Sequence, residues 1–168
     1  MSNLVLDMKR YPSKKCMPKW AKYYRKSQEK GLFNIIYRVL FRIEMKKYCI
    51  EISRNSKIGG GCYFGHPYGI TINPSAIIGK NCNIHKGVTI GQENRGIRKG
   101  TPIIGDEVWI GVNSTIVGKI NIGNDVLIAP NTYVNCDVPS HSIVFGNPCV
   151  IKHSENATEH YINRKVTD

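Results

Sequence analysis

Residues 104–134 read IGDEVW IGVNST IVGKIN IGNDVL IAPNTY V, with a large aliphatic residue at every sixth position. A period of six fits neither an α-helix, with about 3.6 residues per turn, nor a half-buried strand, which alternates about every two residues. It is typical of the hexapeptide repeat of a parallel β-helix. The sequence therefore predicts a mainly β chain whose coils stack along one axis.

The same interval runs through the centre of the chain in three blocks. Their large residues are Ile52, Ile58, Phe64 and Ile70, then Ile72, Ile78, Ile84 and Ile90, and finally Ile104, Ile110, Ile116, Ile122, Ile128 and Val134. Each unit should form a short strand and a turn, and three units should close one triangular coil. Burying one such side chain stabilises a fold by roughly 1.5–3 kcal/mol, so we expect this stack to dominate stability.

Two interruptions of the repeat are the places where function is expected. The slip between Ile70 and Ile72 follows the segment GHPYG at 65–69, which contains His66. Between Ile90 and Ile104 the spacing no longer fits, and residues 92–102 are rich in glycine and basic side chains. This segment should loop out, and loops on a rigid scaffold often carry functional residues.

Charge and composition divide the chain into three parts. Residues 1–50 hold 13 Lys and Arg against 3 Asp and Glu, so most of the net charge of +12 lies there. We expect a loose arm over 1–15 and helices over 18–30 and 32–48, followed by the β-helix over 51–152 and a polar, mobile tail over 153–168. The second helix is expected to pack on the β-helix or on a neighbouring subunit. Its basic and apolar residues leave open the alternative of an anionic membrane surface.

Several classes of partner and compartment are disfavoured. No nucleic-acid motif accompanies the basic segment, and we expect no nucleic acid to bind. The six cysteines have no zinc spacing, and Cys62 and Cys82 occupy inward positions of the repeat, where they suit packing. There is no early signal pattern and no apolar run long enough to cross a bilayer. We expect a cytoplasmic protein, with a peripheral contact to the inner membrane left open.

Particular segments of the repeat region resemble the serine O-acetyltransferase branch of the hexapeptide acyltransferases. They are the entry from Glu51 to Gly59, the turn from Phe64 to Ile70, the segment IHKGVTIG at 84–91, re-entry at Pro102 and closure over 138–148. The resemblance covers roughly residues 40–152. It implies a left-handed β-helix, a homotrimer with active sites between subunits, and direct transfer of acetyl from acetyl-CoA to an acceptor hydroxyl.

The resemblance also implies roles for individual residues. His66 would be the general base, and Glu51, where the serine enzymes carry Asp, would orient it, as in triad logic. A backbone N–H near Gly91 would stabilise the oxyanion. The remaining acetyl-CoA positions would be Gly111, Val112, Ala129, Pro130 and Lys152, and weaker acceptor candidates are His85, Arg95 and Arg98. The carbonic anhydrases of this fold need three clustered histidines, and because only His66 and His85 precede the loop, no metal is expected.

The chain departs from the serine enzymes at the positions expected to grip the amino acid. Gly65 replaces the Asp before the catalytic His, and Gly100 and Thr101 replace the Arg-His pair before Pro102. We therefore expect an acetyltransferase acting on a sugar hydroxyl in surface-polysaccharide biosynthesis. The alternatives are a serine O-acetyltransferase of cysteine biosynthesis and a non-catalytic trimeric β-helix scaffold.

Overall fold

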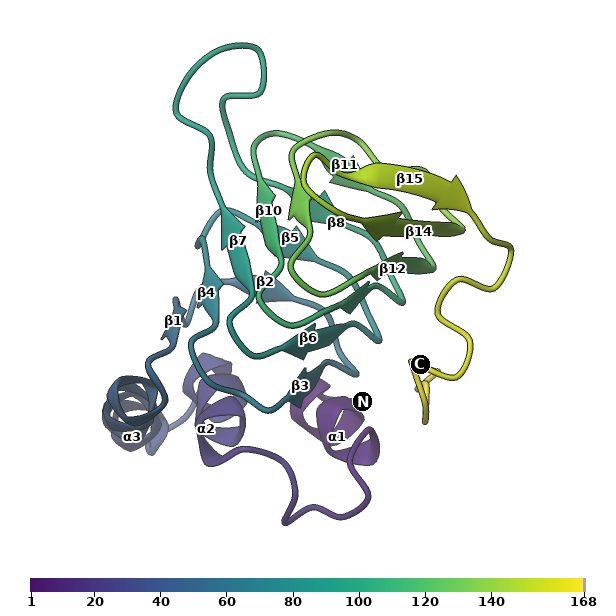
Figure 1. The fold of residues 1–168 in the computed structure, drawn as a ribbon. Helices are drawn as coiled ribbons and strands as arrows, with labels where there is room; N and C mark the ends of the chain where they lie inside the picture. The colour runs from purple at the N-terminus through teal and green to yellow at the C-terminus, as the bar shows by residue number, and fades with distance from the viewer. Residues whose placement is uncertain (168) are drawn as a thin grey trace.

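The computed structural model describes residues 1–167 and consists of a parallel β-helix with three helices at its first coil (Figure 1). Successive strands pass around three sheets, whose strands are parallel except for β15. The first sheet holds β1 (Glu51–Ile52), β4 (Thr71–Ile72), β7 (Thr89–Gly91), β10 (Thr115–Val117) and β13 (Tyr133–Val134). The second holds β2 (Lys57–Ile58), β5 (Ile77–Ile78), β8 (Ile103–Ile104) and β11 (Asn121–Ile122). The third holds β3 (Tyr63–Gly65), β6 (Asn83–His85), β9 (Trp109–Ile110), β12 (Val126–Ile128), β14 (Ser142–Phe145) and β15 (Val150–His153).

The register confirms the prediction of stacked hexapeptide coils. In the first sheet Ile52, Ile72, Ile90, Ile116 and Val134 lie directly over one another in adjacent strands. All five are buried, as are the smaller inward residues Cys62, Ala76, Cys82, Val88, Val108 and Val126. The core is therefore a set of aliphatic columns that run along the axis, and it holds the backbone of every coil in a fixed position.

Both interruptions of the repeat are explained by the connections between sheets. From Phe64 to Ile72 the chain passes from the third sheet to the first with two more residues than the connection from Ile84 to Ile90. The segment 92–102 links β7 to β8 and projects from the β-helix as a loop (Figure 1). Glu93 and Gly100 close the base of this loop through two backbone hydrogen bonds of 3.0 Å.

The expected loose arm over 1–15 is wrong. Helix α1 (Asn3–Lys9) lies against the first coil, and Leu6, Asp7, Arg10 and Tyr11 are buried. The first coil has no coil beneath it, so its backbone groups need other partners. Asp7 accepts the N–H of Cys62 at 2.9 Å, Tyr11 accepts that of Phe64 at 2.9 Å, and Arg10 donates to the carbonyl of Gly61 at 2.5 Å.

Helices α2 (Lys19–Gln28) and α3 (Asn34–Tyr48) begin within two residues of the expected positions. Helix α3 packs mainly on α2 and little on the β-helix, and its packing on a neighbouring subunit stays a prediction. The polar α2 buries Trp20, Ala21 and Tyr24, and the indole of Trp20 meets the ring of Phe64 edge-on at 4.5 Å. In the apolar α3 only Phe41 is fully buried. Most of the apolar surface of α3 is therefore not covered by the β-helix of the same chain. None of the helices described over 1–167 is long and apolar enough to cross a membrane.

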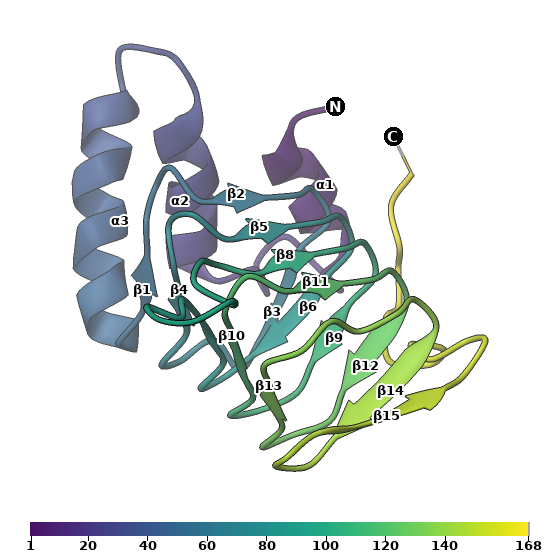
Figure 2. The ribbon, with the colours of Figure 1, turned by 90° about the horizontal axis from the view of Figure 1, so that it is seen from above.

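The last coil is closed by the antiparallel pair β14 and β15. The expectation of a mobile tail over 153–168 is wrong for the described residues. Ala157, Thr158 and Ile162 are buried, and Val166 exchanges two hydrogen bonds with the side chain of Asn81. The tail runs back along the third sheet toward the N-terminus (Figure 2). This contact could not be read from its polar composition.

Candidate active site

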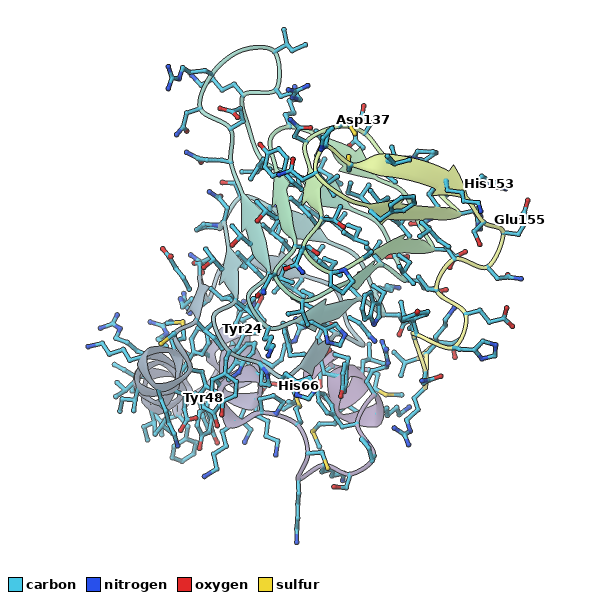
Figure 3. All side chains as sticks on the ribbon, in the orientation of Figure 1. Tyr24, Tyr48, His66, Asp137, His153 and Glu155 are labelled. Carbon is cyan, nitrogen blue, oxygen red and sulfur yellow. The ribbon has the colours of Figure 1, made fainter. Side chains whose placement is uncertain are left out.

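His66 stands at the point where the first coil leaves the third sheet, directly after β3 (Figure 3). Its side chain is exposed and its backbone has a φ of 49°. This left-handed conformation is uncommon for a residue with a Cβ, and residues held in it cluster at functional sites. The same corner in the later coils uses Gly87, Asn113 and Asn131 at positive φ, whereas His66 belongs to the two-residue insertion. The insertion therefore presents one imidazole outside the repeat.

Glu51 lies beside this corner, because the backbone after α3 runs along it. The N–H of Gly69 donates to the carbonyl of Tyr48 at 3.0 Å, and the N–H of Glu51 donates to that of Ile70 at 2.9 Å. Glu51 is exposed, and within residues 1–167 no hydrogen bond or ion pair joins its carboxylate to His66. The fold thus brings both expected catalytic residues to one corner, and their pairing remains a prediction.

The ring of His85 lies directly over Gly65. The two residues are register partners in β3 and β6, and a Cβ on Gly65 would lie 2.5 Å from the His85 ring. Trp109 packs on the other side, with ring centroids 4.7 Å apart, and Tyr161 of the tail meets Trp109 edge-on. Sequence reasoning missed Trp109 and Tyr161, since nothing in a linear repeat connects a distant tail to this ring.

Burial makes His85 a neutral residue. Desolvation, with a smaller contribution from the charge of His66, lowers the pKa of His85 to about 4. Its Nε2 atom is buried and has no hydrogen-bond partner within the described chain. A neutral, enclosed imidazole cannot bind a carboxylate as a cation would. The expected contact of His85 with the acceptor substrate is therefore limited to an uncharged contact.

Four of the expected acetyl-CoA positions stack on the same corner as His66. Gly111 and Val112 follow β9, Ala129 and Pro130 follow β12, and the N–H of Asn131 donates to the carbonyl of Val112 at 2.9 Å. A Cβ on Gly111 would lie 2.6 Å from the nitrogen of Pro130, so only glycine allows these coils to approach. Lys152 lies exposed in β15 opposite Ile143, beyond the last of these coils.

The loop that carries Arg95 and Arg98 begins directly after Gly91, at the end of β7. Gly91 ends β7 and lines, together with Glu51, Met45 and Asn73, a pocket of about 370 Å³. Arg95 and Arg98 are exposed on the loop that leaves this sheet for the second sheet. His66 precedes the same sheet and the loop follows it, so a single chain does not bring Arg95 or Arg98 to His66. No group of three or more His, Cys, Asp or Glu side chains in residues 1–167 could hold a metal ion.

The family described as "Bacterial transferase hexapeptide (six repeats)" matches residues 101–136. The serine acetyltransferase of Synechococcus elongatus is 32% identical over 114 residues, which cover 68% of this chain and 47% of that protein. The chain is a hexapeptide-repeat protein of the serine O-acetyltransferase-like branch. This hexapeptide-repeat protein spans less than half the length of the curated relatives that it matches.

Two solved structures extend the similarity to the fold. The soybean serine acetyltransferase apoenzyme aligns with a TM-score of 0.72 at 26% identity, covering 90% of this chain and 66% of that one. A serine acetyltransferase from Brucella abortus in complex with coenzyme A aligns with a TM-score of 0.64 at 26% identity, covering 72% of this chain and 48% of that one.

Proposed function

We propose that this protein is an acetyl-CoA-dependent O-acetyltransferase with His66 as its general base. The observation that carries the proposal is the insertion that exposes His66, in a left-handed turn, on the corner where Val112 and Ala129 stack. The similarity to serine acetyltransferases supports the same activity. An acetyltransferase needs a proton acceptor next to a surface that can hold the long pantetheine arm, and this corner offers both.

The residues present suit the acyl donor. Val112 and Ala129 are half-buried and Pro130 is exposed, so the corner presents an accessible apolar surface to pantetheine. Lys152, beyond the last coil, is suited to the phosphates of the nucleotide end. Acetyl-CoA supplies an activated acetyl thioester whose carbonyl can be attacked directly by a hydroxyl.

The chain itself would manage the proton. An alcohol is a weak nucleophile, so His66 would take its proton as the oxygen attacks the thioester carbonyl. The same proton then leaves with the sulfur, and the products are an acetyl ester and free CoA thiol. The carboxylate of Glu51 would orient the ring and stabilise the imidazolium, and a backbone N–H near Gly91 would stabilise negative charge on the carbonyl oxygen.

L-Serine is the acceptor that the relatives support, and the sugar acceptor favoured by the sequence has no support among them. A sugar hydroxyl is kept as a second candidate for one specific reason. The neutral ring of His85 fills the space over Gly65, where the serine enzymes are expected to place a carboxylate. A neutral ring offers no negative charge to an ammonium group, so an acceptor without one would suit this position better.

Assembly is part of the proposal. His66 lies where the chain enters the first sheet, and the loop that carries Arg95 and Arg98 lies where the chain leaves it. A homotrimer would place the loop of one subunit near the His66 corner of the next, giving active sites between subunits. Its formation is checked by the mass in solution, and a monomer at assay concentration would contradict it.

The decisive experiment measures release of CoA thiol from acetyl-CoA with L-serine beside a panel of sugars and nucleotide sugars. His66→Ala should lower the rate by about 10²–10⁴-fold, the usual contribution of a general base. His160→Ala, which changes an exposed histidine of the tail, is the matched control and should keep full activity. An unchanged rate in His66→Ala contradicts the mechanism. Failure of every acceptor in the panel to release CoA thiol favours the scaffold alternative.

A further inference from the structure

The outward face of α3 carries an apolar stripe that nothing in residues 1–167 covers. Ile35, Val39 and Ile43 follow one another at helical spacing and are 68%, 55% and 58% exposed. Leu32 and Phe33, in the turn before the helix, are also exposed. Large aliphatic side chains scattered singly on a surface are ordinary, but a continuous stripe along a helix indicates an interaction surface.

A basic stripe lies directly beside the apolar one. Arg38, Arg42 and Lys46 follow Ile35, Val39 and Ile43 by three residues each, and the six side chains together line one groove of about 320 Å³. Lys47 adds a further exposed cation to the last turn. The single acidic residue of α3, Glu44, is half-buried and belongs to the inner side of the helix. The exposed face of α3 is therefore apolar and cationic at once.

The position of α3 leaves this face accessible. The helix forms the outer edge of the molecule, with α2 and the first coil on its inner side (Figure 2). Packing two copies of the face on each other would bring Arg38, Arg42 and Lys46 of both copies into one interface, and like charges brought together destabilise an interface. A surface that carries negative charge over a fluid apolar interior would match both the basic and the apolar stripe of the helix.

We propose that α3 docks this protein on anionic lipid bilayers. Ile35, Val39 and Ile43 would enter the boundary between headgroups and acyl chains, with Leu32 and Phe33 at the leading end. Arg38, Arg42 and Lys46 would reach the lipid phosphates beside them, since long basic side chains keep their stems in apolar surroundings and their charge in the polar layer. The helix lies along the surface and does not cross the bilayer.

Co-sedimentation with vesicles tests the proposal on the whole chain. The protein should pellet with vesicles of phosphatidylcholine mixed with phosphatidylglycerol, and far less with pure phosphatidylcholine, since each basic residue near the surface favours the anionic leaflet. Raising the salt concentration should weaken the binding, as charged contacts at a surface are screened. Free inorganic phosphate should not compete, because it offers no apolar layer.

Two pairs of substitutions separate the charge from the apolar contact. Arg38→Gln with Arg42→Gln, and independently Val39→Gln with Ile43→Gln, should each lower vesicle binding by roughly tenfold or more. All four side chains are exposed, so folding should be kept and the circular dichroism spectrum unchanged. Arg95→Gln with Arg98→Gln removes the same charge from the exposed loop and is the matched control, which should still bind.

Three results would overturn the proposal. One is no binding of the unmodified protein to anionic vesicles. Another is an equal loss in the Arg95 and Arg98 control, which would reduce the effect to net charge. The third is a lower sedimentation mass of the Val39 and Ile43 variant in the absence of lipid, which would assign the stripe to a contact between copies of this chain. None of these results depends on acetyl transfer, so the proposed function is tested separately.

Discussion

An aspartate holds a terminal segment of the chain against each end of the β-helix, but the two aspartates lie in opposite surroundings. At the first coil, the Nε of Arg25 forms an ion pair with Oδ2 of Asp7 at 2.6 Å. Only 2% of the Arg25 side chain and 0% of the Asp7 side chain are exposed. At the last coils, Nδ1 of His141 lies 3.0 Å from Oδ2 of Asp125. Here 14% of the Asp125 side chain and 48% of the His141 side chain are exposed. Asp125 also accepts the backbone N–H groups of Ala157 and Thr158, each at 3.0 Å. One carboxylate closes a core, and the other fastens a tail.

The difference follows from what each end has to cover. The first coil presents carbonyls that need donors, and Arg25 reaches those of Ile58 and Gly59 at 2.7 and 2.6 Å. A guanidinium can satisfy several carbonyls, but only a buried anion makes its burial tolerable. At the other end, β15 already pairs with β14, so Asp125 has only to hold the tail. Interactions at the first end should therefore be worth more, and four experiments test this.

The largest effect is expected from Asp7→Asn. The substitution leaves the buried guanidinium of Arg25 without its counter-charge, which usually costs about 3–5 kcal/mol of unfolding free energy. Urea denaturation measures the loss. The double variant Asp7→Leu with Arg25→Met is the control and should recover part of it, because the charge is removed together with its partner. A loss in Asp7→Asn no greater than that in an exposed Asp→Asn variant would break the comparison.

The second effect concerns His85, which lies close to the first coil and is kept neutral by burial. Because its pKa falls from 6.5 to about 4, the unfolded chain binds the proton first. Stability from this group is complete above pH 6.5 and is lost as the pH falls from 6.5 toward 4, by about 1–3 kcal/mol after allowing for partial solvent screening. Unfolding curves across this range measure it. His85→Leu should flatten the profile, and an identical slope in that variant would assign the loss elsewhere.

The third effect tests the far end through Asp125→Ala. Loss of hydrogen bonds at a partly exposed carboxylate should lower stability by about 1–2 kcal/mol, less than at Asp7. The tail over 153–167 should become open to proteases while the coils stay intact, which limited proteolysis followed by mass spectrometry detects. Glu155→Ala, a nearby exposed change, should leave the tail protected. Equal losses for Asp7 and Asp125 variants would remove the distinction between the ends.

The smallest effect is expected at His141. Its pKa is shifted upward, so its contribution to stability changes with pH in the opposite direction to that of His85. The hydrogen bond to Asp125 raises the pKa of His141 above 6.5. The stabilisation is therefore complete below pH 6.5 and is lost as the pH rises through the raised value. Titration of the imidazole by NMR measures the shift, and Asp125→Asn should return the pKa toward 6.5. A pKa of His141 that does not respond to that substitution would contradict the pairing.

The coils were predictable because each inward side chain recurs at a fixed interval. The period of six located the strands, and its two breaks located His66 and the loop over 92–102. The resemblance added roles for Glu51 and for Gly111 and Ala129, which the fold brings to one corner with His66 or beside it. The packing of His85 against Gly65 was not predictable, since two residues twenty apart meet only through the register of β3 and β6.

The packing of the two terminal segments was not predictable, for a related reason. The segment over 1–15 has no apolar periodicity, because Asp7 and Arg10 dock through hydrogen bonds to the backbone of the first coil. The tail over 153–167 likewise packs through a few side chains that meet separate coils. Polar composition suggests mobility only when the partners of the polar groups are unknown, and here the partners lie far away in sequence.

The sequence by itself determined the β-helix, since a repeated inward aliphatic side chain can be buried only by stacking one coil on the next. It also determined where the repeat fails, and with it the position of the exposed histidine. Only the tertiary structure decided how the open ends are closed, which imidazole is neutral, and which apolar face of α3 stays uncovered. Those properties depend on which groups meet in space, and burial and pairing act between coils and segments that the linear order keeps apart.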